Sequence, residues 1–218
     1  LPEEGFLQGL RTACDQWGVL LVFDEVMTGF RVHSQGAFAR YEVVPDLFAL
    51  GKVIGGGLPL AAFAGSAEIM RYLSPEGPVY QAGTLSGNPV AVAAGIATLE
   101  ELENKDYLSL EQESRLLIEG LEVLAKDCGI PFQGMYAGGM FGFFFSTAKV
   151  SSFYDIQPSH VERFTVFHRE MLRQGIYFAP SAYEAAFISF CHGEGQRQLT
   201  LDAAKIAFVR MAEEVNLS

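Results

Sequence analysis

The chain has 218 residues, of which half are hydrophobic and 19% are charged, a composition typical of a globular protein and too apolar for disorder. Its formal net charge of −11 argues against nucleic acid as a partner, because phosphate backbones are bound by basic surfaces. No apolar run reaches the roughly 18 residues that cross a bilayer, so no membrane partner is expected. Cys14, Cys128 and Cys191 lack metal-ligand spacing, so we expect reduced thiols, no bound metal and a cytoplasmic location.

The first half of the chain has the pattern of an α/β domain. Pro2–Trp17 has the periodicity of an amphipathic helix. Val19–Phe23 is a continuous apolar run, which is typical of a parallel strand buried on both faces. Further along, the pattern predicts strands at residues 47–50 and 60–64, a short helix at 67–73 and a loop at 74–87.

A predicted helix ends the first half of the chain, and the second half is predicted to form a small α+β domain. Asn88 and Pro89 have the residue types of a helix N-cap and first helical position, and the helix should run to about Asn104. Because a polar patch follows, we place the domain boundary there, giving domains 1–104 and 105–218. Beyond it, the pattern predicts helices at 107–127, 159–174 and 196–215, and strands within 130–146, 176–178 and 187–190.

Two ionisable residues, Asp24 and Lys52, directly follow predicted strands, and open parallel sheets bind ligands beyond the carboxyl ends of their strands. A lysine amine can form a Schiff base with an aldehyde cofactor, and a carboxylate facing a pyridine nitrogen keeps it protonated. Taken singly, such an Asp is more often a loop cap and such a Lys a surface residue. The glycines at 55–57 favour the functional interpretation, because a bare backbone lets a bulky group approach closely.

Three motifs in order resemble class III aminotransferases, which are pyridoxal-phosphate enzymes of the type I fold. Leu21–Arg31 resembles the cofactor-ring strand of that family, and Leu50–Pro59 resembles its Schiff-base loop. Tyr80–Pro89 is most similar to the glutamate-1-semialdehyde aminomutases within the family, as are Gly175–Ser181 and Tyr183–Ala185. The resemblance implies an α/β fold made of part of a large, mainly parallel cofactor-binding domain and a small α+β domain.

The resemblance also implies roles for residues around the cofactor ring. Asp24 would pair with the pyridine nitrogen of pyridoxal phosphate, and Val26 would pack on one face of the ring. Lys52 would hold the cofactor as a Schiff base and move protons during the reaction. A low-dielectric pocket and a cationic ring would both favour the neutral amine that this role needs.

A second group of residues is expected to act at the edge of the site. By the resemblance, Gly83 and Thr84 reach the cofactor phosphate of the neighbouring subunit, which implies a homodimer with shared active sites. Amides at the start of the helix after Asn88 could assist in binding that phosphate. Glu184 is expected to lie near the substrate and cofactor and to tune specificity.

The implied activity is an intramolecular amino transfer that uses pyridoxal phosphate and its pyridoxamine form to convert glutamate 1-semialdehyde into 5-aminolevulinate in tetrapyrrole (porphyrin) biosynthesis. A class III aminotransferase acting on an ω-amine or amino acid, and a non-catalytic relative of the same fold, remain as alternatives. Departures from the family pattern at 48–49, 64–66 and 193–195 leave the cofactor core intact but make the substrate less certain.

The N-terminal half of such enzymes, with its phosphate cup and stacking aromatic ring, has no counterpart in this sequence. We therefore expect the chain to be the C-terminal portion of a longer protein, with a plastid as the alternative to a cytoplasmic location if the source is eukaryotic. We also expect that by itself it neither binds the cofactor tightly nor turns over substrate.

Overall fold

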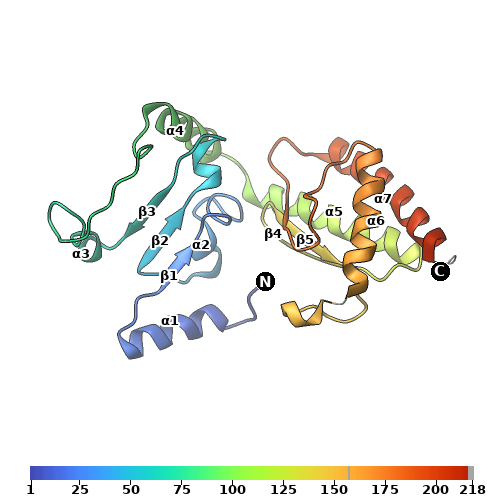
Figure 1. Ribbon diagram of the computed structural model, residues 1–218, viewed down its shortest axis with the longest axis horizontal. Helices are drawn as coiled ribbons and strands as arrows, with labels where there is room; N and C mark the ends of the chain where they lie inside the picture. Colours follow the sequence, from blue (N-terminus) through green and yellow to red (C-terminus); the bar gives the residue numbers. More distant parts are fainter. Residues whose placement is uncertain (157, 216–218) are drawn as a thin grey trace. The chain divides into compact units, whose positions relative to one another are not determined.

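The computed structural model describes residues 1–156 and 158–215 and divides the chain into two units, Leu1–Tyr107 and Leu108–Ser218 (Figure 1). This division falls close to the boundary that we expected after residue 104. Within the described ranges, none of the helices combines the length and the apolar character needed to cross a bilayer.

The first unit contains a three-stranded sheet in the order β1–β2–β3 (Figure 1). β1 (Val22–Asp24) pairs parallel with β2 (Leu47–Leu50), and β2 pairs antiparallel with β3 (Ala62–Gly65). The expected mainly parallel sheet is therefore parallel in only one of these two pairings. The link between β2 and β3, residues 51–61, is shorter than the dozen or so residues of a parallel crossover, so the chain has to return antiparallel.

The apolar run that leads into β1 is exposed in this chain, so the prediction of a strand buried on both faces was wrong here. Val19, Leu20 and Val22 are each more than half exposed, at 55%, 54% and 55%. Strand side chains point to the two faces of a sheet, and the described part of the first unit leaves these three side chains uncovered. A run of this kind is typical of a covered strand, so these side chains form an apolar surface that the chain itself leaves open.

The first unit also contains several helical elements. The N-cap that we predicted at Asn88 is confirmed. The Asn88 side-chain oxygen accepts hydrogen bonds of 3.1 Å from the N–H groups of Val90 and Ala91, with Pro89 in the first turn. A five-residue helix in the β1–β2 connection and a 3₁₀ turn after β2 were not predicted. The helical elements are α1 (Phe6–Trp17), α2 (Ala37–Tyr41), η1 (Lys52–Gly55), α3 (Ala67–Met70) and α4 (Pro89–Glu103).

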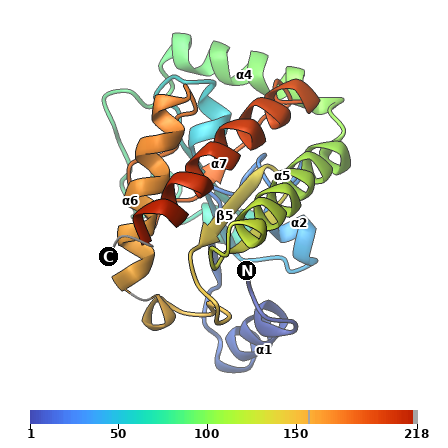
Figure 2. The same cartoon turned by 90° about the vertical axis from the view of Figure 1, so that its right-hand side faces the viewer.

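The second unit packs three long helices against an antiparallel sheet in the order β4–β5–β6 (Figure 2). Its elements are α5 (Tyr107–Asp127), β4 (Gln133–Ala137), β5 (Met140–Phe144), η2 (Phe153–Asp155), α6 (Pro158–Arg173), β6 (Ala186–Phe187) and α7 (Glu194–Val215). The predicted strand at 176–178 was wrong, because that segment has no strand partner in the described chain. The last strand is also shorter and earlier than the predicted 187–190.

Alternation along β5 explains how the helices are held. Phe141, Phe143 and Phe145 are 4%, 8% and 1% exposed, as expected when every second residue of a strand faces a core. The Phe143 ring packs edge-on against Phe167 of α6 at 5.4 Å, and the Phe167 ring lies 5.3 Å from Phe208 of α7. The second unit therefore has an aromatic core that spans sheet and helices.

Candidate active site

Asp24 occupies the last position of β1, at the carboxyl end of the strand. It lies opposite Ala49 of β2, and the next residue, Glu25, continues the ladder by donating its N–H to the Ala49 carbonyl at 2.8 Å. One carboxylate oxygen of Asp24 accepts the Val26 N–H at 3.0 Å. This bond turns the chain away from the sheet and leaves the second oxygen of an exposed carboxylate available.

Lys52 follows β2 after a single glycine, Gly51, and is the first residue of η1, at the same edge of the sheet. Its backbone φ is 47°, in the left-handed region that non-glycine residues seldom adopt and that costs on the order of 1–3 kcal/mol. The side chain is exposed, and within the described residues it makes no hydrogen bond or ion pair. Such strain at the end of a strand is found most often where a side chain must be aimed at a ligand.

The segments that follow β1 and β2 lie in contact with each other. A Cβ added to Gly51 would lie 3.3 Å from Cγ1 of Val26, so the backbone just before Lys52 passes directly against the Val26 side chain. Asp24, Val26 and Lys52 therefore come from neighbouring segments at one end of the β1–β2 pair.

The glycine run after Lys52 has a use that the sequence did not reveal. A Cβ on Gly56 would lie 2.2 Å from Oγ1 of Thr98, so this glycine allows η1 to pack against α4. Gly95 of α4 is equally restricted, because its Cβ would lie 2.7 Å from the Ile54 carbonyl oxygen. At Gly56 the bare backbone thus accommodates a helix of the same chain rather than a bulky ligand.

Glu25 is a buried carboxylate that the sequence analysis did not select. It is 1% exposed and accepts hydrogen bonds of 2.9 Å from the N–H groups of Ala37 and Phe38 at the start of α2, and another from the Thr28 hydroxyl. Gly36 must be bare here, because its φ is 93° and a Cβ would lie 2.9 Å from both carboxylate oxygens. Glu25 therefore links the beginning of the loop after β1 to the start of α2.

Tyr107 fixes the middle of the same loop. Its hydroxyl donates to the carbonyl of Phe30 at 2.9 Å, and Phe30 has a φ of 56°. Burial raises the pKa of Tyr107, and burial also lowers the pKa of the neighbouring Arg31. The segment after Asp24 is therefore held at two points by groups that are largely withdrawn from water.

Gly83 and Thr84 lie in an exposed loop that precedes α4. A Cβ on Gly83 would meet only the Ser86 hydroxyl within 4 Å, so the loop lies against itself at this point. The first amides of α4 are not open to an anion as we had expected, because the Asn88 side chain already accepts from Val90 and Ala91. Any phosphate contact from this region must therefore come from residues 83–87.

Glu184 belongs to the second unit and is exposed. Its N–H donates to the Ser181 carbonyl at 3.3 Å, which makes a turn just before β6. It lines a cavity of only about 10 Å³ beside Phe143, Phe164 and Phe178, which has room for no more than about one water. The structure thus presents Glu184 on a turn whose underside is filled by aromatic rings.

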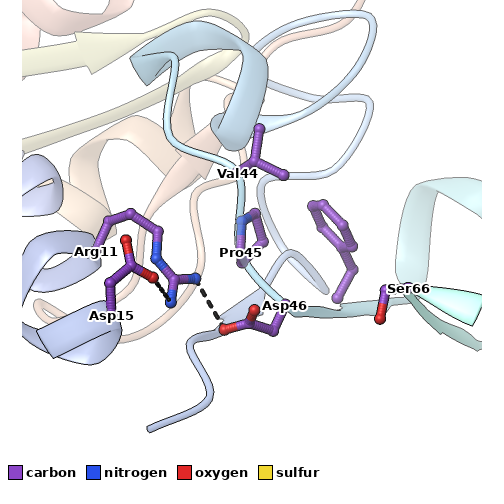
Figure 3. Close-up of a pocket in the computed structure, with 7 residues that line it drawn as sticks. Arg11, Asp15, Val44, Pro45, Asp46 and Ser66 are labelled. Carbon is purple, nitrogen blue, oxygen red and sulfur yellow. Dashed lines mark hydrogen bonds and ion pairs between the residues drawn. The ribbon is translucent and has the colours of Figure 1, made fainter. Parts of the chain in front are cut away.

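A hollow lies at the opposite ends of the strands from Asp24 and Lys52. This pocket of about 480 Å³ is lined by Arg11, Asp15 and Asp46, and Figure 3 shows the three side chains pointing toward one another. Arg11 pairs with Asp46 at 2.8 Å and with Asp15 at 2.7 Å. Two carboxylates neutralise the single cation, so the pocket has no surplus positive charge for a phosphate group.

Comparison with known proteins places this geometry in a family. The model of the class-III aminotransferase family matches residues 1–188. An ω-transaminase from Sphaerobacter thermophilus is 28% identical with a TM-score of 0.88, over 97% of this chain and 48% of that one. A β-phenylalanine aminotransferase from Variovorax paradoxus is 28% identical with a TM-score of 0.81, over 94% and 47%.

A glutamate-1-semialdehyde aminomutase from Pseudomonas aeruginosa, solved in complex with PMP, is 22% identical with a TM-score of 0.83, over 96% of this chain and 49% of that one. At this identity the likeness shows the fold alone. The chain spans about half the length of each of these solved structures.

The mixed α/β architecture, with its ionisable residues at the carboxyl ends of β1 and β2, is part of the type I fold of pyridoxal-phosphate enzymes. Within that fold, the chain belongs to the class III aminotransferase family.

Proposed function

We propose that this chain supplies the cofactor lysine and the ring-binding strand of a pyridoxal-phosphate-dependent aminotransferase. The observation that carries the proposal is the convergence of Asp24, Val26 and Lys52 at one end of the β1–β2 pair. The left-handed backbone at Lys52 supports it, because strain of this kind has to be maintained by the surrounding structure.

The residues present fit this cofactor. When bound, pyridoxal phosphate supplies an electron-accepting ring that stabilises negative charge on a substrate carbon. The carboxylate oxygen of Asp24 that the Val26 N–H leaves free can hold the protonated ring nitrogen in place. The Lys52 amine can bind the cofactor aldehyde and afterwards carry a proton to and from the substrate. Val26, half-buried against Gly51, offers a small apolar surface for one face of a flat ring.

We further propose that Gly83 and Thr84 bind the cofactor phosphate in a neighbouring subunit of a homodimer. Their loop is exposed, and the nearest neighbour of Gly83 is a hydroxyl of the same loop. A backbone amide and a hydroxyl are both suitable donors to phosphate oxygens. This arrangement would make each active site depend on two copies of the chain.

As the specific reaction, we propose the isomerisation of glutamate 1-semialdehyde to 5-aminolevulinate. An amine is added to the aldehyde carbon and the original amine is removed from the neighbouring carbon, so nitrogen is conserved and no second substrate is consumed. The proposal rests on the resemblance of Tyr80–Pro89 and of the segment around Glu184 to aminomutases. Glu184 would contact the substrate and contribute to specificity.

Transamination of an ω-amine or an amino acid is the second candidate. It is favoured by the identities, since an ω-transaminase and a β-amino-acid aminotransferase are each 28% identical to this chain, against 22% for the aminomutase. The same Asp24 and Lys52 would serve this reaction, with Glu184 facing a different substrate.

An assay of the full-length protein separates the two reactions. Incubation with glutamate 1-semialdehyde alone should give 5-aminolevulinate in many turnovers if the aminomutase proposal is right. If turnover requires an added amino donor and keto acid, the enzyme is an aminotransferase and the aminomutase proposal is refuted.

The Lys52→Ala variant tests the cofactor role itself. The absorption band of lysine-bound pyridoxal phosphate should be lost, and kcat should fall by at least about 10²–10⁴-fold, the range for losing a positioned proton-transfer group. Lys105→Ala is a suitable control, because that lysine pairs with Glu101 on the surface. A wild-type protein without the band would favour the non-catalytic alternative.

A further inference from the structure

The segment between α6 and β6 carries Glu184, yet no sheet holds it. Near its start, Ile176 donates its N–H to the Met171 carbonyl at 2.9 Å, and the strand pairing of Ala186 and Phe187 holds its far end. Among the described residues from Tyr177 to Tyr183, no hydrogen bond between backbone groups reaches another element. Something other than a ladder must therefore fix this stretch.

Two histidines of α6 supply that attachment. His160 is 1% exposed, and its Nδ1 accepts the Phe145 N–H at 3.1 Å. The single proton of the neutral ring must then sit on Nε2, which donates to the Ala182 carbonyl at 3.1 Å. His168 acts in the same way, and its Nε2 donates to the Phe178 carbonyl at 3.0 Å.

The spacing of these contacts shows how the segment runs. The two histidines are eight positions apart, which is about 12 Å along a helix at 1.5 Å per residue. The two carbonyls are four positions apart, which is about 13 Å in extended chain. Because His168 binds the earlier carbonyl and His160 the later one, residues 178–182 run antiparallel to α6 along one side of it, with a bend at Pro180.

We propose that His160 and His168 are positioning residues that hold residues 178–182 in place and thereby set the position of Glu184 for substrate binding. This inference rests on the proposed function, in which Glu184 contacts the substrate. Glu184 lies two residues after Ala182 and two residues before Ala186, so its position depends on the histidine contact on one side and on the strand pairing on the other.

Aromatic contacts restrict the movement of both partners of the hydrogen bond between His168 and Phe178. The Phe164 ring stacks on His168 at 5.9 Å, so the imidazole has little freedom to turn away. Phe178 packs edge-on against Phe143 at 5.9 Å, directly beside the carbonyl that His168 binds. Removing one imidazole N–H should therefore loosen the segment without emptying the core beneath it.

The test uses the full-length protein loaded with pyridoxal phosphate. His168→Phe keeps a ring for Phe164 to stack on but removes the donor to Phe178, whereas His168→Gln keeps an N–H at similar reach. Glu162→Gln, an exposed change on the same helix, is the matched control. The readouts are amide hydrogen exchange of residues 178–184, the cofactor absorption band, and kcat and KM determined separately.

For His168→Phe we expect exchange of the Tyr183 and Glu184 amides, which donate to Ser181, to become about tenfold faster, the effect of losing one hydrogen bond. KM should rise about three- to tenfold with kcat within about twofold and an unchanged absorption band, because only substrate placement is affected. His168→Gln and the control should stay close to wild type. Unchanged exchange and KM in His168→Phe would overturn the proposal.

A double variant tests the link to Glu184. If the histidine acts through Glu184, His168→Phe should raise KM much less when Glu184→Gln is already present. An undiminished effect would overturn that link. If His168→Phe fails to fold, His168→Asn, whose amide is too short to reach the Phe178 carbonyl, replaces it. If the wild type does not use the semialdehyde, the proposed reaction fails, while hydrogen exchange in the same variants still decides whether the histidines hold the segment.

Discussion

At the scale of single residues, the candidate site depends on atoms that are either strained or withdrawn from water. Lys52 adopts a left-handed backbone conformation, and Glu25 places a carboxylate in the interior, where its hydrogen-bond donors are backbone amides and a hydroxyl. Asp24 and Lys52 could be selected from the sequence because each follows an apolar strand. Glu25 could not, because its partners lie 12 and 13 positions away and are defined only by the fold of the loop.

Replacing Glu25 should destabilise the protein strongly. Glu25→Ala leaves the buried N–H groups of Ala37 and Phe38 without an acceptor, and each such loss costs about 1–3 kcal/mol. Urea unfolding of the full-length protein measures the change, with the exposed Glu42→Ala as control. A Glu25→Ala protein as stable as wild type would show that the carboxylate does not hold the loop.

At the scale of helices and strands, the sequence predicted correctly where a helix begins if the capping residue lies within a few positions of the helix. Asn88 with Pro89 defined the start of α4 correctly, because the cap bonds reach only two and three residues ahead. The prediction of a strand at 176–178 was wrong. The carbonyl of Phe178 is bound by the side chain of His168 on α6 and not by the backbone of a neighbouring strand. The antiparallel direction of β3 could also not be predicted from its own residues, because it depends on how the chain connects β2 to β3.

The attachment of α1 to the sheet predicts a dependence of stability on pH. The Leu21 N–H and then the Arg11 guanidinium lower the pKa of Asp46 below its ordinary value of 3.8. The folded state therefore favours the ionised carboxylate, so its contribution is complete above the ordinary pKa and is lost as the pH falls through the lowered value.

Asp46→Asn should remove this dependence. The variant should be less stable at neutral pH, and its stability should fall less steeply than that of wild type as the pH drops below about 3.8. Unfolding midpoints between pH 2 and 7 provide the measurement. Asp127→Asn, remote in sequence and in the other unit, is the control, and parallel curves for Asp46→Asn and wild type would contradict the assignment.

At the scale of the whole molecule, the first unit carries an open apolar surface. Trp17 is 75% exposed and Val19 and Val22 each 55%, although their pattern is that of residues in contact with other protein. The chain spans about half the length of the solved structures that it matches. Together with the proposed function, these two observations lead us to propose that this chain needs further protein contacts to act as an enzyme.

The 218-residue chain alone should therefore behave as an incomplete enzyme. We expect it to bind a hydrophobic dye and to self-associate, and to show neither tight binding of pyridoxal phosphate nor turnover. Light scattering, dye fluorescence and cofactor titration provide the measurements, with the full-length protein as reference. A monomeric chain that binds the cofactor tightly would contradict this expectation.

Shared active sites can be tested by mixing two inactive variants of the full-length protein. Lys52→Ala and Thr84→Ala should each lower activity, but a mixed dimer contains one intact site if Thr84 serves the neighbouring subunit. Random exchange of subunits should restore about one quarter of wild-type activity, since half of the dimers are mixed and half of their sites are intact. No recovery after exchange would show that each site takes both residues from the same subunit and would contradict the shared-site proposal.

The sequence by itself determined the family, the helices with local caps and the strand ends near which Asp24 and Lys52 lie, because these depend on residues close together in the chain. Only the tertiary structure decided that Glu25 closes the loop after β1, that Gly56 faces α4, and that histidines rather than strand pairing hold the segment before Glu184. In each of these cases the partners are distant in sequence, and a hydrogen bond or close contact exists only once the packed chain has brought them together.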